Sequence, residues 1–594
     1  IAVLALLLPL ALETLRPLLV GAYADGEGGT TFALLRLGTS VMLLAVPAAA
    51  MGATFPIASR WMVRGAAHAA QEAGGLYAAN TLGAAIGALL AGFVLIPSLG
   101  LSGSTWVGVA LNVAAAAGAF VIARSATSTE GRDFSPGHKD RVGTAEAKAS
   151  ALRTAGRPWL AALALGASGF ASLTLQVVWT RLLVQILGPT TYAFSLVVAI
   201  FIIGLAGGAA IGSWLVARVR HASVGLAIGL LVSAALSLAA ASAVDWALLT
   251  IAEIVARPEY QFNDVLAREG LMVLALLLPM ALAFGTAFPF AVALAGGSDD
   301  TVTESLGRIY AVNTIGAIAG ALLAGFVLVP QIGLHLTIRL VAATLAVAAI
   351  AILVTAGQGR GRLAGYALAG VVLLAGVTLP QWDRLLLSSG GYKYAPAMRG
   401  PSLATSLAAG ELLSYREGAS GTVAVRRLAG TVSLSIDGKV DASNAGDMLT
   451  QRLLAHVPLL LHPNPKRVAI IGLGSGVTLG SALTHPIAAA TVLEISPEVV
   501  DASRFFETEN HRALADPRTR LVVGDGRTHL MLGRETYDVI VSEPSNPWMA
   551  GIASLFTREF FEGARARLAP GGMLCQWAHT YDISSDDLRS IVAT

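Results

Sequence analysis

The sequence is poor in cysteine and in charge. Its single cysteine, Cys575, excludes an internal disulfide and a zinc site built from cysteines. Only 13% of its 594 residues are charged and 55% are hydrophobic, whereas soluble domains carry about 25% charged residues. The net charge of +3 and the lack of a Lys/Arg run argue against a nucleic-acid partner. We therefore expect much of the chain to lie in a lipid bilayer.

Long apolar runs fill the chain as far as Pro380. A helix needs about 20 such residues to cross a bilayer, so the runs predict roughly eleven spans. They lie near 1–22, 32–59, 75–97, 102–123, 158–186, 191–217, 224–252, 270–296, 306–330, 334–356 and 363–380. The last run is the weakest, because it is only 18 residues long and contains three glycines.

The apolar runs contain an internal repeat. Residues 76–97 are identical to residues 309–330 at 16 of 22 positions, and ATFP at 53–56 corresponds, at the same offset, to TAFP at 286–289. The second copy holds six runs and the first only four, so we expect two further spans ahead of Ile1. An even number of spans gives the copies parallel topology, as in the two halves of major-facilitator-type transporters.

Basic residues are divided unequally between the two sets of loops. One set contains 14 Lys and Arg residues and the other only Arg257 and Arg268, so we expect the first set to be cytoplasmic. The polar segment 125–157 then links a first membrane repeat (1–124) to a second repeat with one extra apolar segment (158–380). This predicts a multi-pass protein of the inner (plasma) membrane. The side on which the chain beyond Pro380 lies stays open, because 363–380 either crosses the membrane or re-enters it.

From Gln381 the composition becomes that of an α/β domain. The first part, 381–465, is β-rich and contains a hairpin and a helix at 447–461. Strands and helices then alternate through 466–594, which predicts a parallel, doubly wound sheet of Rossmann type. The expected strands are 467–471, 490–495, 520–524, 537–542 and 572–577, and the expected helices start near 476, 497 and 557. We expect this domain to continue beyond Thr594.

Glycines and acids lie at the carboxyl ends of these strands, where such sheets bind ligands. Three glycines follow the first strand: Gly472, Gly474 and Gly476. They let the backbone approach a ligand closely. Glu494 ends the second strand, where an acid holds ribose hydroxyls; Asp525 ends the third, and Glu543 the fourth. Each acid alone could also be a helix cap or a surface loop residue, but together they predict a nucleoside site.

These motifs resemble the spermidine synthase (polyamine aminopropyltransferase) family, and most closely its membrane-embedded bacterial members. The resemblance covers about 381–594 and rests on WDRLLLSSGGYKYAP, LSIDGK, HVPLLLHPNPKRVAIIGLGSG, LEISPEVV, DPRTRLVVGDGR and YDVIVSEPSNPW. It implies a methyltransferase-type fold that binds decarboxylated S-adenosylmethionine as co-substrate, without a metal, and transfers its aminopropyl group to an amine. The donor contacts it implies come from Gly472, Gly474, Ser475, Gly476, Glu494, Asp525 and Gly526. Glu543 matches the position of the catalytic aspartate.

The acceptor half departs from the family pattern. Ser475 replaces an aspartate in the glycine loop, and the two acids of a D-x-x-D motif become Glu543 and Asn546. A glutamine after the DG pair becomes Asp441, and the histidine of a Tyr-His-Glu set becomes Gln451. We expect Glu543 to act as the base, and Asp441, Gln451 and Asn546 to contact the acceptor. The identity of the acceptor amine stays open.

Two other functions also fit the sequence. The neutral Ser475 would tolerate the carboxylate of intact S-adenosylmethionine, which favours a different S-adenosylmethionine-dependent transferase. The repeated bundle suits a polyamine transporter or sensor whose C-terminal domain only binds its ligand. The expected partners are a small amine and the lipid bilayer, and not nucleic acid. The sequence leaves open whether the chain forms a homo-oligomer.

Overall fold

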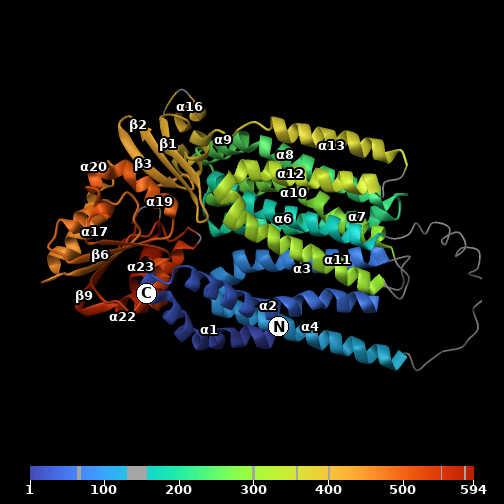
Figure 1. The fold of residues 1–594 in the computed structure, drawn as a ribbon, viewed down its shortest axis with the longest axis horizontal. Helices are drawn as coiled ribbons and strands as arrows, with labels where there is room; N and C mark the ends of the chain where they lie inside the picture. Colours follow the sequence, from blue (N-terminus) through green and yellow to red (C-terminus); the bar gives the residue numbers. More distant parts are fainter. Residues whose placement is uncertain are drawn as a thin grey trace, which may run out of the picture.

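The computed structural model describes residues 1–62, 69–129, 157–296, 302–355, 359–398, 400, 402–549, 551–580 and 583–594. Long helices form the N-terminal part, and two sheets with short helices form the C-terminal domain at one end of them (Figure 1). Most of the predicted linker 125–157, with all of its basic residues except Arg157, lies outside the described residues.

The N-terminal part consists of helices that run roughly side by side (Figure 1). They are α1 (Ala2–Tyr23), α2 (Gly29–Met62), α3 (Ala69–Leu90), α4 (Ile96–Thr129), α6 (Pro158–Leu187), α7 (Thr191–Val216), α8 (Ala222–Ser242), α9 (Val244–Val255), α10 (Phe262–Ala295), α11 (Val302–Leu323), α12 (Val329–Thr355) and α13 (Gly361–Thr378). The π-helical segments η2 (Ala91–Leu95) and η3 (Ala324–Leu328) follow α3 and α11.

Nine helical stretches in the described part of the chain are long and apolar enough to cross a membrane, judged by length and composition. Two of them, Ala69–Arg124 and Glu304–Thr355, have 56 and 52 residues and are therefore long enough for two crossings each. Every predicted run overlaps one of the nine stretches. The predicted run 224–252 divides at Ala243 into α8 and the shorter α9.

The internal repeat of the sequence is also a repeat of structure. Helices α2 and α10 begin and end at equivalent positions of the two copies, as do α3 and α11, and η2 and η3. The two longest stretches each break at a glycine, Gly100 with φ 67° and Gly333 with φ 81°. Residues with a side chain rarely adopt such φ values, which explains why glycine occupies both positions. The two breaks also lie at equivalent positions of the repeat.

The C-terminal domain begins with three short helices and an antiparallel sheet. The helices are α14 (Arg384–Leu387), α15 (Gly391–Tyr394) and α16 (Leu403–Leu407). The sheet has the order β1-β2-β3-β4, with β1 (Glu411–Glu417), β2 (Thr422–Leu428), β3 (Thr431–Ile436) and β4 (Lys439–Ser443). The predicted hairpin is confirmed as β2 and β3, and the predicted helix at 447–461 is confirmed as α17 (Met448–Leu461).

The second sheet is parallel and has the order β7-β6-β5-β8-β9. Its strands are β5 (Arg467–Ile471), β6 (Ala489–Glu494), β7 (Thr519–Val523), β8 (Tyr537–Ser542) and β9 (Leu568–Gln576). The helices around it are α18 (Val477–Leu483), α19 (Pro497–Ala502), α20 (Glu507–Asn510), α21 (Gly526–Leu532), α22 (Arg558–Ala566) and α23 (Ser585–Ala593). The predicted Rossmann-type parallel sheet is confirmed.

The order of the strands fixes where a ligand can bind. From β5 the chain moves outward to β6 and β7, and then returns to the other side of β5 for β8 and β9. Ligands of such sheets bind where the direction of winding reverses, here between the carboxyl ends of β5 and β8. The strands are buried on both faces: Val468 and Ile470 pack into one apolar cluster, and Ala469 and Ile471 into another.

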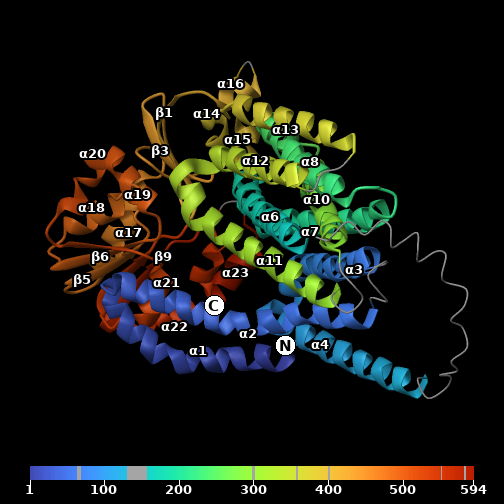
Figure 2. The same ribbon diagram turned by 45° about the vertical axis from the view of Figure 1, so that its right-hand side comes forward.

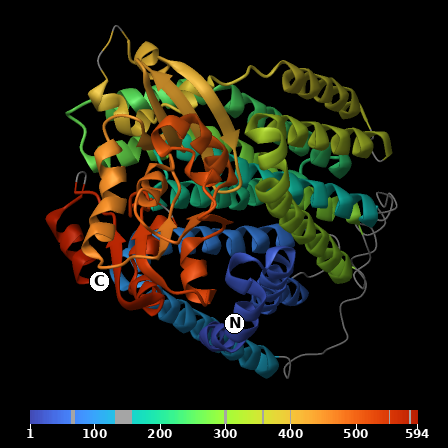
Figure 3. The same ribbon diagram turned by 60° about the vertical axis from the view of Figure 1, so that its left-hand side comes forward.

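The C-terminal domain covers one end of the helices (Figure 3). Arg181, near the end of α6, donates hydrogen bonds of 2.7 and 2.8 Å to the backbone carbonyls of Gly418 and Ala419, in the turn between β1 and β2. The end of α1 lies beside α21 (Figure 2). There the Tyr23 hydroxyl lies 2.8 Å from Nδ1 of His529. The basic loops at Arg218, Arg308 and Arg362 lie at the opposite ends of their helices.

Candidate active site

A glycine turn connects β5 to α18 and forms the base of the site. Gly472 has φ 93°, and a Cβ added there would lie 2.8 Å from the carbonyl oxygen of Glu543. Any larger residue would therefore push apart the ends of β5 and β8. Oε2 of Glu494 accepts a 2.9 Å hydrogen bond from the backbone N–H of Leu473, which holds the turn against the end of β6.

Above this turn lies a cavity of about 1000 Å³. Its walls come from the glycine turn, the ends of β6, β7 and β8, strand β4 and the start of α17. Among the predicted site residues, nine line it: Asp441, Gln451, Gly472, Gly474, Ser475, Glu494, Asp525, Gly526 and Glu543. The three acids predicted at successive strand ends thus share one cavity. Their chemical roles stay predictions.

Two of these acids also organise the backbone around them. Glu494 is buried, and its second oxygen accepts the N–H of Ser496 at 2.9 Å. Burial raises the pKa of the Glu494 carboxyl, and the backbone N–H groups of Leu473 and Ser496 act in the opposite direction. Asp525 caps α21 by accepting from the N–H groups of Arg527 and Thr528. Each acid therefore has a structural role in addition to its place in the cavity.

Glu543 lies at the end of β8 and is only partly exposed. Burial raises the pKa of its carboxyl from 4.5 to about 7, the nearby Asp447 and Asp441 act in the same direction, and a hydrogen bond from Thr478 lowers it. That bond, from Oγ1 of Thr478 to Oε2 of Glu543, is 2.7 Å long. A carboxyl with a pKa near neutrality can exchange a proton with a ligand at physiological pH.

Asp441, which the sequence predicted to contact the acceptor, forms an ion pair within the protein. Nζ of Lys439, two residues earlier on β4, contacts Oδ1 of Asp441 and donates a 2.8 Å hydrogen bond to Oγ of Ser545. Both charged side chains are largely buried, with exposed fractions of 5% and 14%. The sequence analysis missed Lys439, although residues i and i+2 of a strand lie on the same face.

Gln451 joins the glycine turn to the antiparallel sheet. Its amide nitrogen donates to the carbonyl of Ser443 at 2.9 Å and to Asp447 at 2.8 Å, and its amide oxygen accepts from the hydroxyl of Ser475. The side chain is buried at 4% exposure. It therefore fixes the hydroxyl of Ser475 in place, and direct contact with an acceptor remains a prediction.

Two predicted site residues do not line the cavity. Gly476 begins α18 with φ 80° and faces Asn510. Asn546 is fully buried in the loop after β8. Conversely, the cavity includes Lys439, Asp447, Ser545 and Trp577, which the sequence analysis did not single out. Among these four residues, only Lys439 and Asp447 carry a signal in the sequence, namely a charged side chain within a β-rich segment.

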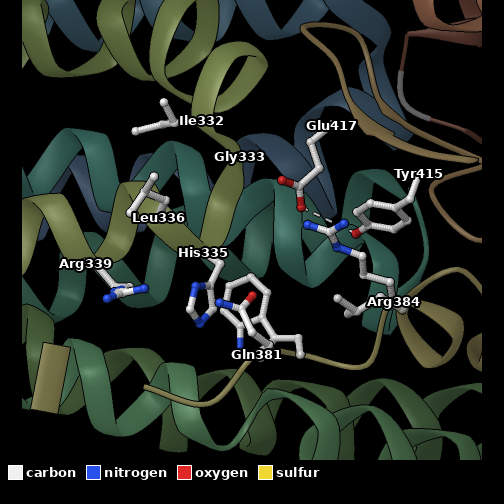
Figure 4. A pocket seen from close by; sticks show the side chains of 11 residues that line it. Ile332, Gly333, His335, Leu336, Arg339, Gln381, Arg384, Tyr415 and Glu417 are labelled. Atoms are coloured by element: carbon white, nitrogen blue, oxygen red, sulfur yellow. Dashed lines mark hydrogen bonds between the residues drawn. The ribbon is translucent and has the colours of Figure 1, made fainter. Parts of the chain in front are cut away.

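A second cavity, of about 230 Å³, lies where the start of α12 meets β1 (Figure 4). Oε2 of Glu417 accepts a 2.8 Å hydrogen bond from the backbone N–H of Leu334, directly after the break at Gly333. The hydroxyl of Tyr415 donates to Gln185 on α6, and the guanidinium of Arg384 lies 5.2 Å from the centre of the Tyr415 ring. These contacts join the helices to β1 and lie away from the carboxyl ends of the parallel strands. We therefore assign this cavity to the junction between the helices and the C-terminal domain.

The parallel sheet, the glycine turn at its switch point and the acids at its strand ends define a Rossmann-like domain. Residues 447–594 match the family described as the spermine/spermidine synthase domain. The C-terminal domain is therefore spermidine-synthase-like, with the helical part and β1–β4 outside the matched residues.

Curated relatives agree with this family. Spermidine synthase of Dictyostelium discoideum is 31% identical over 159 residues, which cover 27% of this chain and 56% of that protein. Polyamine aminopropyltransferase of Archaeoglobus fulgidus is 38% identical over 135 residues, covering 23% and 49%. Putrescine N-methyltransferase 2 of Nicotiana tabacum is 36% identical over 162 residues, covering 27% and 46%. The chain thus spans about half the length of the curated relatives it matches.

Among solved structures, spermidine synthase from Thermotoga maritima matches at 27% identity with a TM-score of 0.26, covering 28% of this chain and 56% of that one. A spermidine synthase in complex with the transition state analogue AdoDATO matches at 26% identity with a TM-score of 0.25, covering 28% and 55%.

Proposed function

We propose that the chain transfers an aminopropyl group from decarboxylated S-adenosylmethionine to a small amine. The observation that carries this proposal is the convergence of Glu494, Asp525 and Glu543 on one cavity above the glycine turn. The match of residues 447–594 to the spermine/spermidine synthase domain supports the same reaction.

In the proposed complex the donor's adenosine lies along the ends of β5, β6 and β7. The ribose hydroxyls are held by Glu494 and the adenine lies beside Asp525 and Gly526. The backbone at Gly472 and Gly474 carries no Cβ, so the donor can approach it closely. The sulfonium then lies towards β8, near Glu543.

The proposed reaction is an in-line displacement. The ionised carboxylate of Glu543 accepts one proton from the acceptor's ammonium, which frees the lone pair of its nitrogen. That nitrogen forms a bond to the methylene carbon next to the sulfonium while the carbon–sulfur bond breaks, and methylthioadenosine leaves as a neutral thioether. Because the sulfonium already activates the carbon, the protein mainly orients the two reactants and takes up the proton.

The test is the release of methylthioadenosine by the purified protein from decarboxylated S-adenosylmethionine and a panel of primary amines. We expect release with at least one amine. In Glu543→Gln the rate should fall by about 10²-fold or more, because a positioned base contributes about 10²–10⁴-fold. If no amine in the panel supports release, the proposed reaction is wrong.

Transfer of a methyl group from intact S-adenosylmethionine is the second candidate. It is favoured by the neutral Ser475 in the glycine turn, whose hydroxyl is held by Gln451. The similarity to a putrescine N-methyltransferase is compatible with it. Calorimetric titration with the two nucleosides separates the candidates, since tighter binding of the decarboxylated form by tenfold or more would exclude methyl transfer as the main activity.

We also propose that the long helices cross the inner membrane. The nine apolar stretches in the described part of the chain support this, and Arg218, Arg308 and Arg362 lie at the ends of their helices opposite to the C-terminal domain. By the positive-inside rule that domain would lie outside the cytoplasm. The donor would then have to be supplied at that face of the membrane.

Labelling of single cysteines tests both the crossing and the side. In a Cys575→Ser background, Glu562→Cys on α22 and Arg220→Cys between α7 and α8 place one exposed cysteine at each end of the molecule. A membrane-impermeant maleimide added to intact cells should label only the cysteine at 562. Equal labelling of the two would contradict the crossing, and labelling only at 220 would reverse the orientation.

A further inference from the structure

The acceptor side of the cavity contains a lysine that belongs to the protein itself. Lys439 is the only Lys or Arg among the described residues that line the cavity, which also include five acids. Its ammonium contacts Oδ1 of Asp441 and Oγ of Ser545, so it joins β4 to the loop that follows Glu543. The hydroxyl of Ser545 also lies 2.6 Å from Oδ1 of Asp441.

The remaining oxygen of Asp441 has no such contact. Oδ2 of Asp441 is buried and lacks a hydrogen-bond partner among the described residues. Asp447, the neighbouring acid, is fully occupied: its oxygens accept from the backbone and hydroxyl of Ser443 and from the amide of Gln451. Glu543, in contrast, accepts one side-chain hydrogen bond, from Thr478, and has no protein cation beside it in the described part of the chain, so it can receive a cationic amine.

We infer that Lys439 determines acceptor specificity, because its ammonium occupies the position beside Asp441 that the second ammonium of a diamine would otherwise take. The site would therefore select an amine whose far end is neutral or anionic over a diamine of the same length. This inference rests on the proposed aminopropyl transfer and names the class of its acceptor.

Electrostatics explains the selection. A diamine whose reacting nitrogen lies at Glu543 would bring its second ammonium towards Asp441, where the charge of Lys439 already neutralises the carboxylate. The two cations would repel each other in a partly desolvated cavity, where charges are weakly screened. A hydroxyl at the far end could instead donate to the unpartnered Oδ2 of Asp441, and a carboxylate could accept from Lys439.

Three acceptors with the same four-carbon amine test the inference: 1,4-diaminobutane, 4-amino-1-butanol and 4-aminobutyrate. Their far ends are cationic, neutral and anionic. For the unmodified protein we expect kcat/KM for the better of the last two to exceed that for the diamine at least tenfold. A preference of the unmodified protein for the diamine would overturn the inference.

Two variants test the residue itself. Lys439→Met frees Asp441, and the ratio of kcat/KM for the diamine to that for the amino alcohol should rise at least tenfold. Lys439→Met leaves the buried carboxylate of Asp441 without its ion-pair partner. The double variant Lys439→Met/Asp441→Asn therefore removes both charges together, and it should bring the ratio close to one. The exposed Lys466, which precedes the amino end of β5 and does not line the cavity, supplies the control Lys466→Met, which should leave the ratio unchanged. A ratio that stays within twofold of the unmodified protein's value in both Lys439 variants would also overturn the inference.

A binding measurement separates this inference from the proposed reaction. The same three amines are titrated by calorimetry into protein saturated with methylthioadenosine. If no amine releases methylthioadenosine in the activity assay, the proposed reaction fails, and the order of the three binding affinities still tests selection by charge. Tighter binding of the diamine than of the amino alcohol would contradict the role of Lys439.

Discussion

Oγ1 of Thr478 lies 2.7 Å from Oε2 of Glu543 and 2.9 Å from the backbone carbonyl of Gln451. A threonine hydroxyl has one proton and cannot donate fully to two acceptors. When Glu543 is protonated, its own O–H can donate to Thr478, whose hydroxyl then donates to Gln451. The geometry thus accommodates both charge states of Glu543, and the bond that Thr478 donates to the ionised carboxylate lowers a pKa that burial raises.

The first prediction concerns the pH dependence of the reaction. Since Glu543 must be ionised to accept a proton and its pKa is raised to about 7, kcat/KM should fall tenfold per pH unit below about pH 7. Thr478→Val removes the hydrogen bond that lowers this pKa, so the midpoint of the profile should move to higher pH. The measurement is the pH profile of kcat/KM for both proteins with the best acceptor.

A matched control for this profile is Thr484→Val, because the hydroxyl of Thr484 donates only to the carbonyl of Ser481 at the end of α18. Its midpoint should coincide with that of the unmodified protein. A midpoint that stays near pH 4.5 in the unmodified protein would mean that Glu543 is not the group that titrates.

The second prediction concerns stability. The folded state binds a proton at Glu543 up to about pH 7, whereas the unfolded state loses this proton near pH 4.5. The free energy of unfolding therefore decreases as the pH rises between these two values. Allowing for its partial exposure, this cost is about 2 kcal/mol above pH 7. Glu543→Gln should therefore raise the free energy of unfolding at pH 8 by about that amount and change it little at pH 4.5.

Thermal unfolding of the detergent-solubilised protein at the two pH values measures this difference. Glu559→Gln, at an exposed acid on α22, is the control and should change stability by less than about 0.5 kcal/mol at either pH. An equal effect of Glu543→Gln at both pH values would show that the change acts through packing and not through charge.

The parallel sheet could be predicted from the sequence because each of its strands is a short apolar run with a clear end. Strand β5 has the predicted bounds, 467–471, since Pro465 and Lys466 precede it and Gly472 follows it. Helix α21 was missed, because GRTHLML is too short for a helical period and its cap is Asp525, which had been considered mainly as a ligand. The predicted helix that starts near 497 consists of shorter segments, α19 and α20, with a turn of 3-10 helix between them.

The acceptor side of the site could be predicted only in part. The motif identified Asp441 and Glu543 as acids, but the hydrogen bonds that link Lys439 and Asp441 to Ser545 come from a loop far along the chain. The link of Gln451 to Ser475 likewise depends on how the antiparallel sheet packs on the glycine turn. Such contacts between distant segments leave no periodic signal in the sequence.

The third prediction concerns the glycine turn. At Gly472 a methyl group would require a strained backbone at φ 93° and would lie 2.8 Å from the carbonyl of Glu543. Gly472→Ala should therefore weaken binding of the donor nucleoside at least tenfold and lower the free energy of unfolding by about 1–3 kcal/mol. Calorimetric titration with the nucleoside and thermal unfolding measure the two effects.

Gly563, within α22, provides the comparison for this substitution. The nearest atom to a Cβ there is Cγ of Met531 at 3.7 Å, an ordinary contact. Gly563→Ala should therefore leave donor binding unchanged and stabilise the helix by about 0.5–1 kcal/mol. Equal effects of the two substitutions on donor binding would contradict a close approach of the donor to the turn.

The fourth prediction concerns the junction of the two parts. Arg181 reaches from α6 to the carbonyls of Gly418 and Ala419, and its loss leaves both carbonyls without this charged donor. Hydrogen bonds to charged groups contribute about 1.5–3 kcal/mol each when partly buried. Arg181→Met should therefore release the turn between β1 and β2 from the helices, and amide exchange of residues 411–428 should become faster.

Exchange at the glycine turn serves as the internal reference, because β5 and α18 are held by the parallel sheet and not by α6. We expect its protection to remain unchanged in Arg181→Met. Arg218→Met is the matched control: Arg218 lies just beyond the opposite end of α7, donates to the carbonyl of Trp214 and stacks on its ring, and has no part in the junction. Unchanged exchange at 411–428 in Arg181→Met, or an equal acceleration in Arg218→Met, would mean that the domain is held at the helix ends by the other contacts, such as Glu417 with Leu334.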